Sequence, residues 1–311
     1  MTYMRLTTKL LNDNVINNLY MNRSKLNDLN EELATGKKIS KPSDDPNAAI
    51  NVMSAKTTND QIERYIDNIE TASSELDMAD QSISQIADVI SRAKELATEA
   101  SNATSGSTQL DAINSEIEQL IQQVKDIANT KFGSKYIFGG QVTDTPPYTQ
   151  SDNGDIVYNG TPSTENYQRK MEISENITVD VNVAGDNIFG QYISSDSTKQ
   201  TGLIGTLTKL SNNLSASSPN YDDIRSSLDE LDDNLNSFLS VQSTVGGTVS
   251  RLDMTKSKLE DDSLTFEKFR TDAEGIDLAK VISDISYQET TLEASLKVGA
   301  KISQYSILDY M

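Results

Sequence analysis

The side chains that could carry chemistry in this chain are carboxylates and hydroxyls, because the sequence contains no His and no Cys. The best candidate cluster is Asp152 and Asp155, which flank Asn153 and Gly154. Two neighbouring carboxylates could serve a hydrolase as acid and base, or could bind calcium. Their spacing does not match a calcium loop, and Asp, Asn and Gly are ordinary turn formers. We interpret this segment as a turn and predict no catalytic residue, no metal site and no cofactor.

The residue types that are missing restrict the chemistry further. Without Cys there can be no disulfide, no thiol nucleophile and no Cys-ligated metal. Without His the chain lacks the side chain best suited to proton transfer near neutral pH. Gly139-Gly140 and Gly246-Gly247 lack the context of a phosphate-binding loop, and we expect the second pair either to let helices approach closely or to relax a long helix. These observations favour a protein that is not an enzyme.

The charge of the chain is strongly acidic and unevenly distributed. Lys and Arg number 27 against 47 Asp and Glu, a net charge of −20. Such a surface repels phosphate backbones and anionic lipid headgroups, so neither nucleic acid nor membrane insertion is expected. Residues 1–41 carry seven basic and four acidic residues, whereas residues 271–311 carry three and seven. The opposite charges favour pairing of the two ends.

Long helices are the main structural prediction. Apolar residues recur at alternating steps of three and four over residues 62–97, which is a heptad seam. A helix over residues 46–100 would be roughly 80 Å long at 1.5 Å per residue, and only a rod could house it. Residues 101–107 are predicted to form a loop, after which a second helix is expected to pack antiparallel to the first. The later helical patterns cover residues 110–127, 203–214 and 224–266.

A change of period between the helices predicts a small β-rich module. Asn153-Gly154 is a strong hairpin signal. Further on, Ile177, Val179, Val181 and Val183 alternate with polar residues, as in a half-buried strand. The predicted fold is therefore mainly α, an elongated bundle of long antiparallel helices with coiled-coil-like seams and a β-rich insertion. The expected domains are a terminal assembly domain (1–41 and 271–311), a helical rod (42–140 and 201–270) and a β-rich outer domain (141–200).

Both ends of the chain are amphipathic helices whose apolar stripes form the predicted assembly interface. Asn22 and Glu289 interrupt the two stripes, and Gly299 weakens the second. Two helices by themselves bury too little apolar surface to offset the entropy of ordering them, so we expect mobile ends that neighbouring copies order. The alternative is an intramolecular pair packed on the base of the rod. The interface residues are Leu11, Val15, Leu19, Leu26, Leu29, Leu33, Leu278, Ile282, Ile285, Leu292, Leu296, Ile302 and Ile307.

Residues 34–49, ATGKKISKPSDDPNAA, resemble a signature of the flagellin and hook-associated protein family of bacterial flagella. In that family a terminal helix ends in a Ser/Thr-Gly-Lys turn, and an Asp-Asp pair opens the next helix. Gly36 can adopt the left-handed conformation that ends a helix. Ser43 or Asp44 can cap the amides that follow, with Asp45 and Pro46 opening the next helix.

Two further segments strengthen the resemblance. Residues 127–140, IANTKFGSKYIFGG, followed by TPPY, are similar to the family's exit from the helical part into its variable domain. The ending ISQYSILDYM resembles the Ser-Leu-Leu-Asp-Tyr-Leu ending of the members that join hook and filament, with Ile307 and Met311 at two of the Leu positions. Flagellins usually carry Ala where this chain has Pro46. The match favours a junction-type member, whereas residues 141–200 match only loosely.

The resemblance implies a flagellar structural subunit that is extracellular, at the hook–filament junction. Members are exported unfolded by the flagellar type III system, with an export chaperone, and the N-terminal stretch here lacks the apolar core of a cleaved signal peptide. The implied partners are other copies in a ring, the first hook-associated protein on the hook side, and flagellin on the filament side. The alternatives are flagellin itself and, more remotely, a carboxylate-dependent hydrolase or a calcium-binding adhesin.

Overall fold

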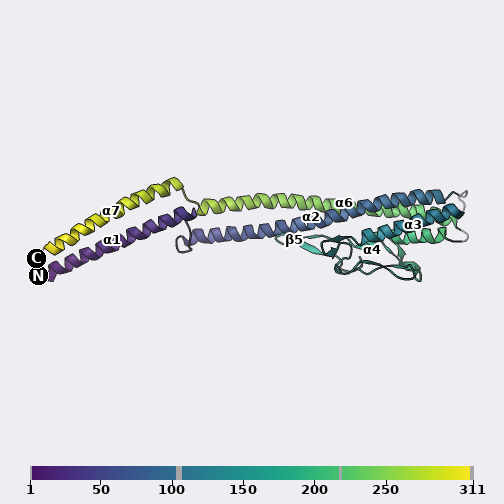
Figure 1. The fold of residues 1–311 in the computed structure, drawn as a ribbon, viewed down its shortest axis with the longest axis horizontal. Coiled ribbons are helices and arrows are strands. Elements are labelled where there is room, and N and C mark those ends of the chain that lie inside the picture. The colour runs from purple at the N-terminus through teal and green to yellow at the C-terminus, as the bar shows by residue number, and fades with distance from the viewer. Residues whose placement is uncertain (1, 103–106, 217–218, 309–311) are drawn as a thin grey trace. The chain divides into compact units, whose positions relative to one another are not determined.

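The computed structural model describes residues 2–102, 107–216 and 219–308, without the side chains of residues 2–9, 11, 107 and 302–308. Contacts divide the chain into two compact units, Met1–Gln61 with Asp261–Met311, and Ile62–Glu260. Two long helices continue from one unit into the other, α2 (Pro46–Ala100) and α6 (Tyr221–Glu274) (Figure 1). The mainly helical fold class is confirmed.

The start of α2 shows why this helix begins at Pro46. The Asp45 carboxylate accepts hydrogen bonds from the backbone N–H groups of Asn47 and Ala48, both at 3.1 Å. It thereby satisfies amides that have no partner within the helix. Pro46 lacks an N–H and suits the first helical position. The predicted bounds, residues 46–100, are confirmed.

In the unit Ile62–Glu260, the heptad seam of α2 forms the core with α3 (Ser107–Ala128). The predicted seam residues of α3 are all buried, as are most of those in α2. Arg92 Nε donates to Glu116 Oε1 at 2.7 Å, and Gln109 Nε2 donates to Glu99 Oε1 at 2.7 Å. Residue numbers in these two pairs rise along α2 and fall along α3, so the two helices are antiparallel, as predicted.

The same core receives α5 (Gly202–Leu214) and the first part of α6. The four leucines predicted to form the short helix are fully buried in α5. Every seventh residue of α6 from Ile224 to Leu259 supplies an apolar side chain to the core, so the late heptad pattern is also confirmed. The buried members are Ile224, Leu231, Phe238, Val245, Leu252 and Leu259.

Short antiparallel strands form the insertion between α3 and α5. The largest sheet has the order β3-β4-β7-β8, and two separate pairs are β1-β2 and β5-β6. The predicted hairpin joins β3 and β4, with Tyr148 opposite Tyr158 and Gly154 at φ +84° in the turn. The strand bounds are Lys131–Phe132, Lys135–Tyr136, Tyr148–Gln150, Ile156–Tyr158, Lys170–Ser174, Ile177–Asp180, Gln191–Tyr192 and Gln200–Thr201 for β1 to β8.

An aromatic cluster shows that this insertion is a folded module packed on a helix. The rings of Phe138 and Phe189 lie 4.9 Å apart edge to face, and Tyr148 lies 5.8 Å from Phe189. Phe189 also lies 5.7 Å from Phe238 of α6. Such edge-to-face pairs are favourable beyond the area they bury. Phe189 precedes β7 and follows the short helix α4 (Gly185–Ile188), which positions it at the centre.

Two predictions about this unit were wrong in part. The strand expected to reach Val183 ends at Asp180, and Ile177 at its start is 43% exposed. Within the described part of the chain, no other helix approaches Gly246 or Gly247 closely, because a Cβ at either position would meet nothing within 4 Å. Both lie inside α6, so the second expectation, that they relax a long helix, is the one that remains.

In the other unit, α1 (Thr2–Thr35) lies beside α7 (Leu278–Leu308) (Figure 1). The predicted pairing of the terminal helices is therefore confirmed. The end of α6 contacts the start of α2 here, where Ser263 Oγ donates to Asn59 Oδ1 at 2.7 Å. Among the described side chains of this unit, the buried apolar residues are only Ala49, Ala55 and Val281.

Candidate assembly interface

The contact between α1 and α7 has a polar centre. Gln288 is only 4% exposed, and its Nε2 donates to the backbone O and to Oδ1 of Asn22 at 3.1 and 3.2 Å. Asn22 Nδ2 in turn donates to Ser295 Oγ at 3.1 Å. A buried polar group of this kind fixes the register of two helices, because any other register would leave it unsatisfied.

This centre changes how the α7 stripe is understood. Asn22 interrupts the α1 stripe as predicted, but its partner is Gln288, whereas Glu289 is exposed. At 3.6 residues per turn, the residues of α7 that face α1 recur at steps of four and three. The first of them is Val281, which is buried and was not among the predicted interface residues. The residues of this face are Val281, Ile285, Gln288, Leu292, Ser295 and Gly299.

Gly299 gives the two helices a close approach near their free ends. A Cβ placed on Gly299 would lie 3.0 Å from Val15 Cγ1 and 4.0 Å from Leu19 Cδ1. The glycine that we expected only to weaken the α7 stripe therefore also makes room for two α1 stripe residues. Any larger side chain there would have to push the helices apart.

The predicted interface residues fall into three groups. Half-buried positions in the helix pair are Val15, Leu19, Leu26, Leu29, Ile285 and Leu292. Positions that keep a large exposed fraction are Leu33 (36%), Leu278 (55%), Ile282 (53%) and Leu296 (53%). The side chains of Leu11, Ile302 and Ile307, and the Asp309-Tyr310 ending, lie outside the described part of the structure.

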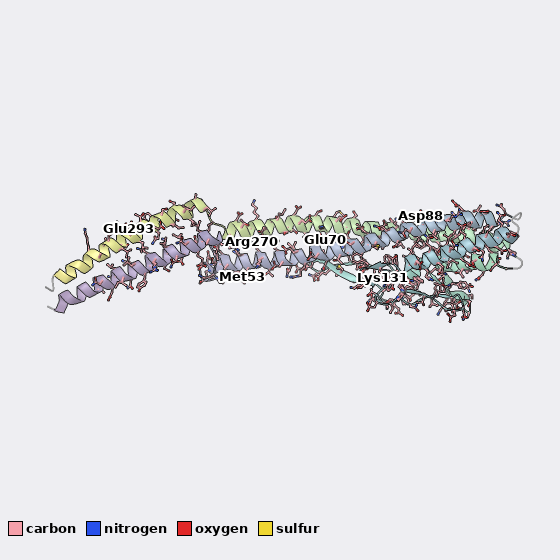
Figure 2. The ribbon with its side chains drawn as sticks, viewed as in Figure 1. Met53, Glu70, Asp88, Lys131, Arg270 and Glu293 are labelled. Carbon is pink, nitrogen blue, oxygen red and sulfur yellow. The ribbon has the colours of Figure 1, made fainter. Side chains whose placement is uncertain are left out.

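Large apolar side chains are unusually exposed in this unit. They occur on α1, on α7, and on the segments of α2 and α6 that belong to this unit. Figure 2 labels Met53 of α2, which is 63% exposed. Exposed apolar surface of this extent is typical of surfaces that bind other proteins. Its members besides those above are Leu10, Ile16, Tyr20, Met21, Ile50, Leu264, Phe269, Tyr287 and Val298.

The signature turn between α1 and α2 folds much as the sequence suggests. Gly36 has φ +69°, and its N–H donates to Glu32 O at 2.8 Å, which ends α1. Asp44 Oδ2 accepts from the amides of Ser40 and Lys41 at 3.1 and 2.9 Å. Asp44 thus closes the preceding turn, and the cap of α2 is Asp45 rather than Ser43 or Asp44. The second Asp of the pair is better placed because it directly precedes Pro46.

A second link, between α6 and α7, contacts the first one. Lys37 and Gly275 form an antiparallel bridge, and Lys38 N donates to Glu274 O at 2.7 Å. A Cβ on Gly275 would lie 2.5 Å from Thr271 O, so this position requires glycine. Asp277 Oδ1 accepts from the amides of Ala279 and Lys280 and caps α7. This link was not predicted from the sequence, although Gly275 and Asp277 are a helix stop and a cap signal.

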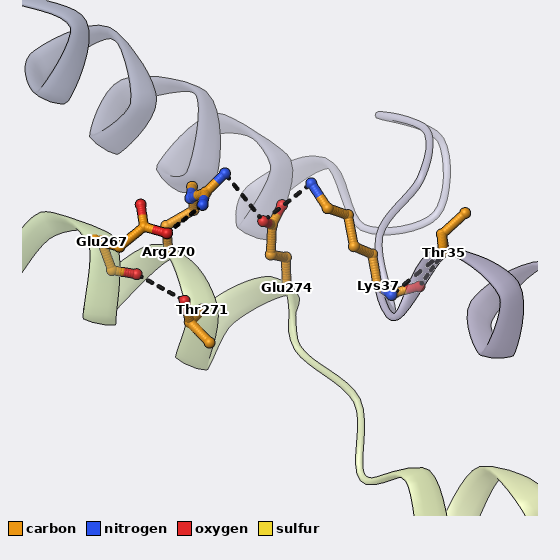
Figure 3. A network of polar contacts seen from close by, with 6 residues as sticks. All are labelled: Thr35, Lys37, Glu267, Arg270, Thr271 and Glu274. Carbon is orange, nitrogen blue, oxygen red and sulfur yellow. Dashed lines mark hydrogen bonds and ion pairs between the residues drawn. The ribbon is translucent and has the colours of Figure 1, made fainter.

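Charged side chains hold the two links together (Figure 3). The Glu274 residue is 8% exposed, and its Oε1 lies 3.1 Å from Lys37 Nζ and 3.5 Å from Arg270 Nη1. Arg270 also pairs with Glu267, and this hydrogen bond is the main cause that raises the pKa of Arg270. A buried carboxylate with two cations is strongly held, because each cation offsets part of its lost hydration. We call Lys37, Arg270 and Glu274 the link clamp.

The other candidate chemistry on the sequence has a structural explanation. Asp155 Oδ1 accepts from Ser194 N at 2.8 Å, and Ser151 N donates to Asp155 O at 2.9 Å, so Asp155 holds the hairpin turn. Over the described residues, no three Asp or Glu side chains converge as a metal site would need. Within those same ranges, every helix is too short or too polar to cross a bilayer.

Comparisons with known proteins agree with the family resemblance. Residues 7–143 match the bacterial flagellin N-terminal helical region. Flagellar hook-associated protein 3 of Escherichia coli is 25% identical, over 98% of this chain and 98% of that protein. A flagellin of Caulobacter vibrioides is 27% identical, but over 41% of this chain and 47% of that protein. The solved structure of a flagellar hook-associated protein from Vibrio parahaemolyticus shares the fold, with a TM-score of 0.66, 19% identity, and coverage of 75% and 100% of the two chains.

Proposed function

We propose that this chain, a structural protein of the bacterial flagellum similar from end to end to flagellar hook-associated protein 3, forms the junction between hook and filament. The observation that carries the proposal is the extent of the similarity. It covers 98% of both chains for the hook-associated protein, whereas the flagellin match covers 41% of this one. The relatives belong to a family of structural flagellar proteins rather than of enzymes, and their flagellar identity implies an extracellular structure.

Assembly proceeds through the terminal domain, residues 1–41 and 271–311. The exposed apolar side chains on α1 and α7 support this assignment, because their burial between subunits would be favourable and a monomer leaves them in water. The buried polar centre at Gln288 supports a fixed register within the pair, so that α1 and α7 present one defined surface. Contacts between one patch and a different patch on the next copy build rings and helical tubes.

The partners follow from this position. Other copies surround the subunit in a ring, the first hook-associated protein lies on the hook side, and flagellin lies on the filament side. The chain travels unfolded through the flagellar type III system, and a flagellar export chaperone accompanies it. A chain without disulfides and with mostly local helical contacts suits such threading. Residues 141–200 form the outer domain, and residues 42–140 and 201–270 form the helical part.

Two measurements distinguish a junction subunit from a flagellin: the flagellin released into the medium after the gene is deleted, and the amount of this chain in sheared flagella. A strain without the junction subunit releases flagellin monomers into the medium, and the subunit is scarce in sheared flagella. A strain without a filament subunit instead lacks the main protein of those preparations. Abundance of this chain throughout sheared filaments would assign it to the filament.

Substitutions on α7 test the assembly surface directly. Ile282→Asp and Leu296→Asp place a charge on side chains that are 53% exposed in the single chain, so folding should be retained. Each should remove about 1.5–3 kcal/mol of burial per subunit contact and prevent filament attachment. Ser283→Asp, on an exposed position of the same helix, is the matched control. Unchanged circular dichroism with lost swimming supports the proposal; normal swimming by both variants would overturn it.

Substitutions at half-buried positions between α1 and α7 provide a second test. Leu26→Asp or Ile285→Asp should also abolish filament attachment while the unit Ile62–Glu260 stays folded. A loss of helicity across the whole chain in either variant would instead favour an intramolecular role for the terminal helices.

A further inference from the structure

Two Asn-Gly pairs occur in the sequence, and the structure holds them very differently. Asn followed by Gly is the dipeptide in which the next backbone nitrogen most easily attacks the side-chain amide, because glycine has no Cβ to obstruct the approach. The first pair, Asn153-Gly154, is the turn between β3 and β4. The second, Asn159-Gly160, directly follows β4.

The first pair is exposed and lightly held. Asn153 and Gly154 are both exposed, in the five-residue connection 151–155 between β3 and β4. The backbone bond that engages the attacking nitrogen runs from Gly154 N to Ser151 O at 2.9 Å. Breaking one exposed hydrogen bond costs only about 0.5–1.5 kcal/mol. Gly154 already has φ +84°, and a Cβ there would meet nothing within 4 Å, so the turn leaves room for the side chain to approach.

The second pair is held from several sides. Asn159 Nδ2 donates to Thr149 Oγ1 at 2.8 Å, and Asn159 N donates to Pro147 O at 2.8 Å. Around Gly160 there is no free space, because a Cβ would lie 2.4 Å from Tyr158 Oη and 2.8 Å from Gly139 O. That tyrosine is itself fixed by donating to Phe138 O at 3.0 Å. Cyclisation at Asn159 would therefore have to break bonds and displace packed groups.

We propose that Asn153 is a site of spontaneous deamidation, and that Asn159 is protected by the fold. Gly154 N forms a bond to Asn153 Cγ, the Cγ–Nδ2 bond breaks, and ammonia leaves with the proton from the Gly154 nitrogen. Water then opens the five-membered imide at either carbonyl, giving aspartate or isoaspartate. No oxidant, metal or enzyme takes part.

The product changes the hairpin in two ways. A new carboxylate lies beside Asp152 and Asp155, and like charges at such short range repel one another. Isoaspartate also adds a methylene to the backbone of a turn whose register depends on the Ser151 N to Asp155 O bond of 2.9 Å. Asp155 in turn holds Ser194 N at 2.8 Å, so the change reaches the segment that follows β7.

Peptide mapping of the full chain after incubation in mildly alkaline buffer tests the proposal. Mass spectrometry together with isoaspartyl methyltransferase labelling should find the modification at Asn153 about ten-fold or more faster than at Asn159, from the two hydrogen bonds that hold the latter. In urea the two sites should react at similar rates, because the fold no longer distinguishes them. Asn153→Gln should remove the main labelled peptide without altering circular dichroism. Equal rates in the folded chain, or a folded chain in which Asn153 stays intact while the unfolded chain reacts, would overturn the proposal.

Discussion

Replacing Arg169 by alanine should undock the β5-β6 hairpin from α2. Arg169 Nη2 pairs with Glu75, whose side chain is 8% exposed against 21% for the arginine. The backbone of Arg169 is also held in place, because its N–H donates to Asn182 Oδ1 at 2.7 Å. A second tie is weaker, from Asn68 Nδ2 to Glu172 O at 2.8 Å. The ion pair is therefore the main polar attachment of the hairpin to the helix.

The magnitude follows from what the substitution leaves behind. Removing one partner of a buried ion pair leaves an uncompensated charge and typically costs 3–5 kcal/mol. If the cost appears as local opening, amide hydrogen exchange over residues 170–180 should accelerate about 100-fold or more, at one factor of ten per 1.36 kcal/mol. The double variant Glu75→Met with Arg169→Met should recover most of the protection, because a well-packed apolar pair replaces the charges.

The effect should depend on pH in a defined direction. Burial raises the pKa of Glu75 above its ordinary value of 4.5, and Arg169 partly opposes this. A carboxyl whose pKa is higher in the folded protein adds stability below its unfolded pKa and loses it as the pH rises through the folded pKa. The exchange difference between Arg169→Ala and the parent protein should therefore be largest at neutral pH and shrink toward pH 4.5.

Lys256→Ala is the matched control for this experiment. It removes an ion pair to Glu70 on the same helix, at 2.7 Å, in which the two side chains are 32% and 57% exposed (Figure 2 labels Glu70). Solvent screens such a pair, so little change is expected. If Arg169→Ala accelerated exchange no more than Lys256→Ala at neutral pH, the reasoning about the buried pair would be refuted.

Three further substitutions probe the helices and their links. Glu274→Ala should destabilise the link clamp by about 1–2 kcal/mol, seen as faster amide exchange in the first turn of α7, whereas Glu293→Ala, on an exposed pair with Lys297, should not change it. Gly246→Ala should stabilise α6 by about 0.4–1 kcal/mol in thermal unfolding, because the site is helical and open; a lower Tm would contradict this. Gly299→Leu should separate α1 from α7 and lower helicity at the chain ends, since a Cβ alone would lie 3.0 Å from Val15 Cγ1; unchanged helicity would count against the close approach.

Periodicity and capping residues by themselves determined most of the fold. The heptad pattern predicted the bounds of α2, and Gly36 and the Asp44-Asp45 pair predicted the stop and start around it. Asn153-Gly154 predicted the β3-β4 hairpin, and the alternation from Ile177 predicted β6, although not its end. These signals are local, because a helix or a tight turn is decided by residues within a few positions of one another.

Tertiary structure decided which of several apolar stripes would be buried. The α7 sequence offers two plausible apolar faces, one with residues 278, 282 and 296 and the other with residues 281, 285 and 292. Contact with α1, through the Gln288–Asn22 hydrogen bonds, buries the second face and leaves the first exposed. In the same way, Lys37 and Glu274 are 237 positions apart, so no local pattern indicates the clamp. Pairings between distant segments depend on how the helices meet, and the physical reason is that burial is a property of the contact and not of the single helix.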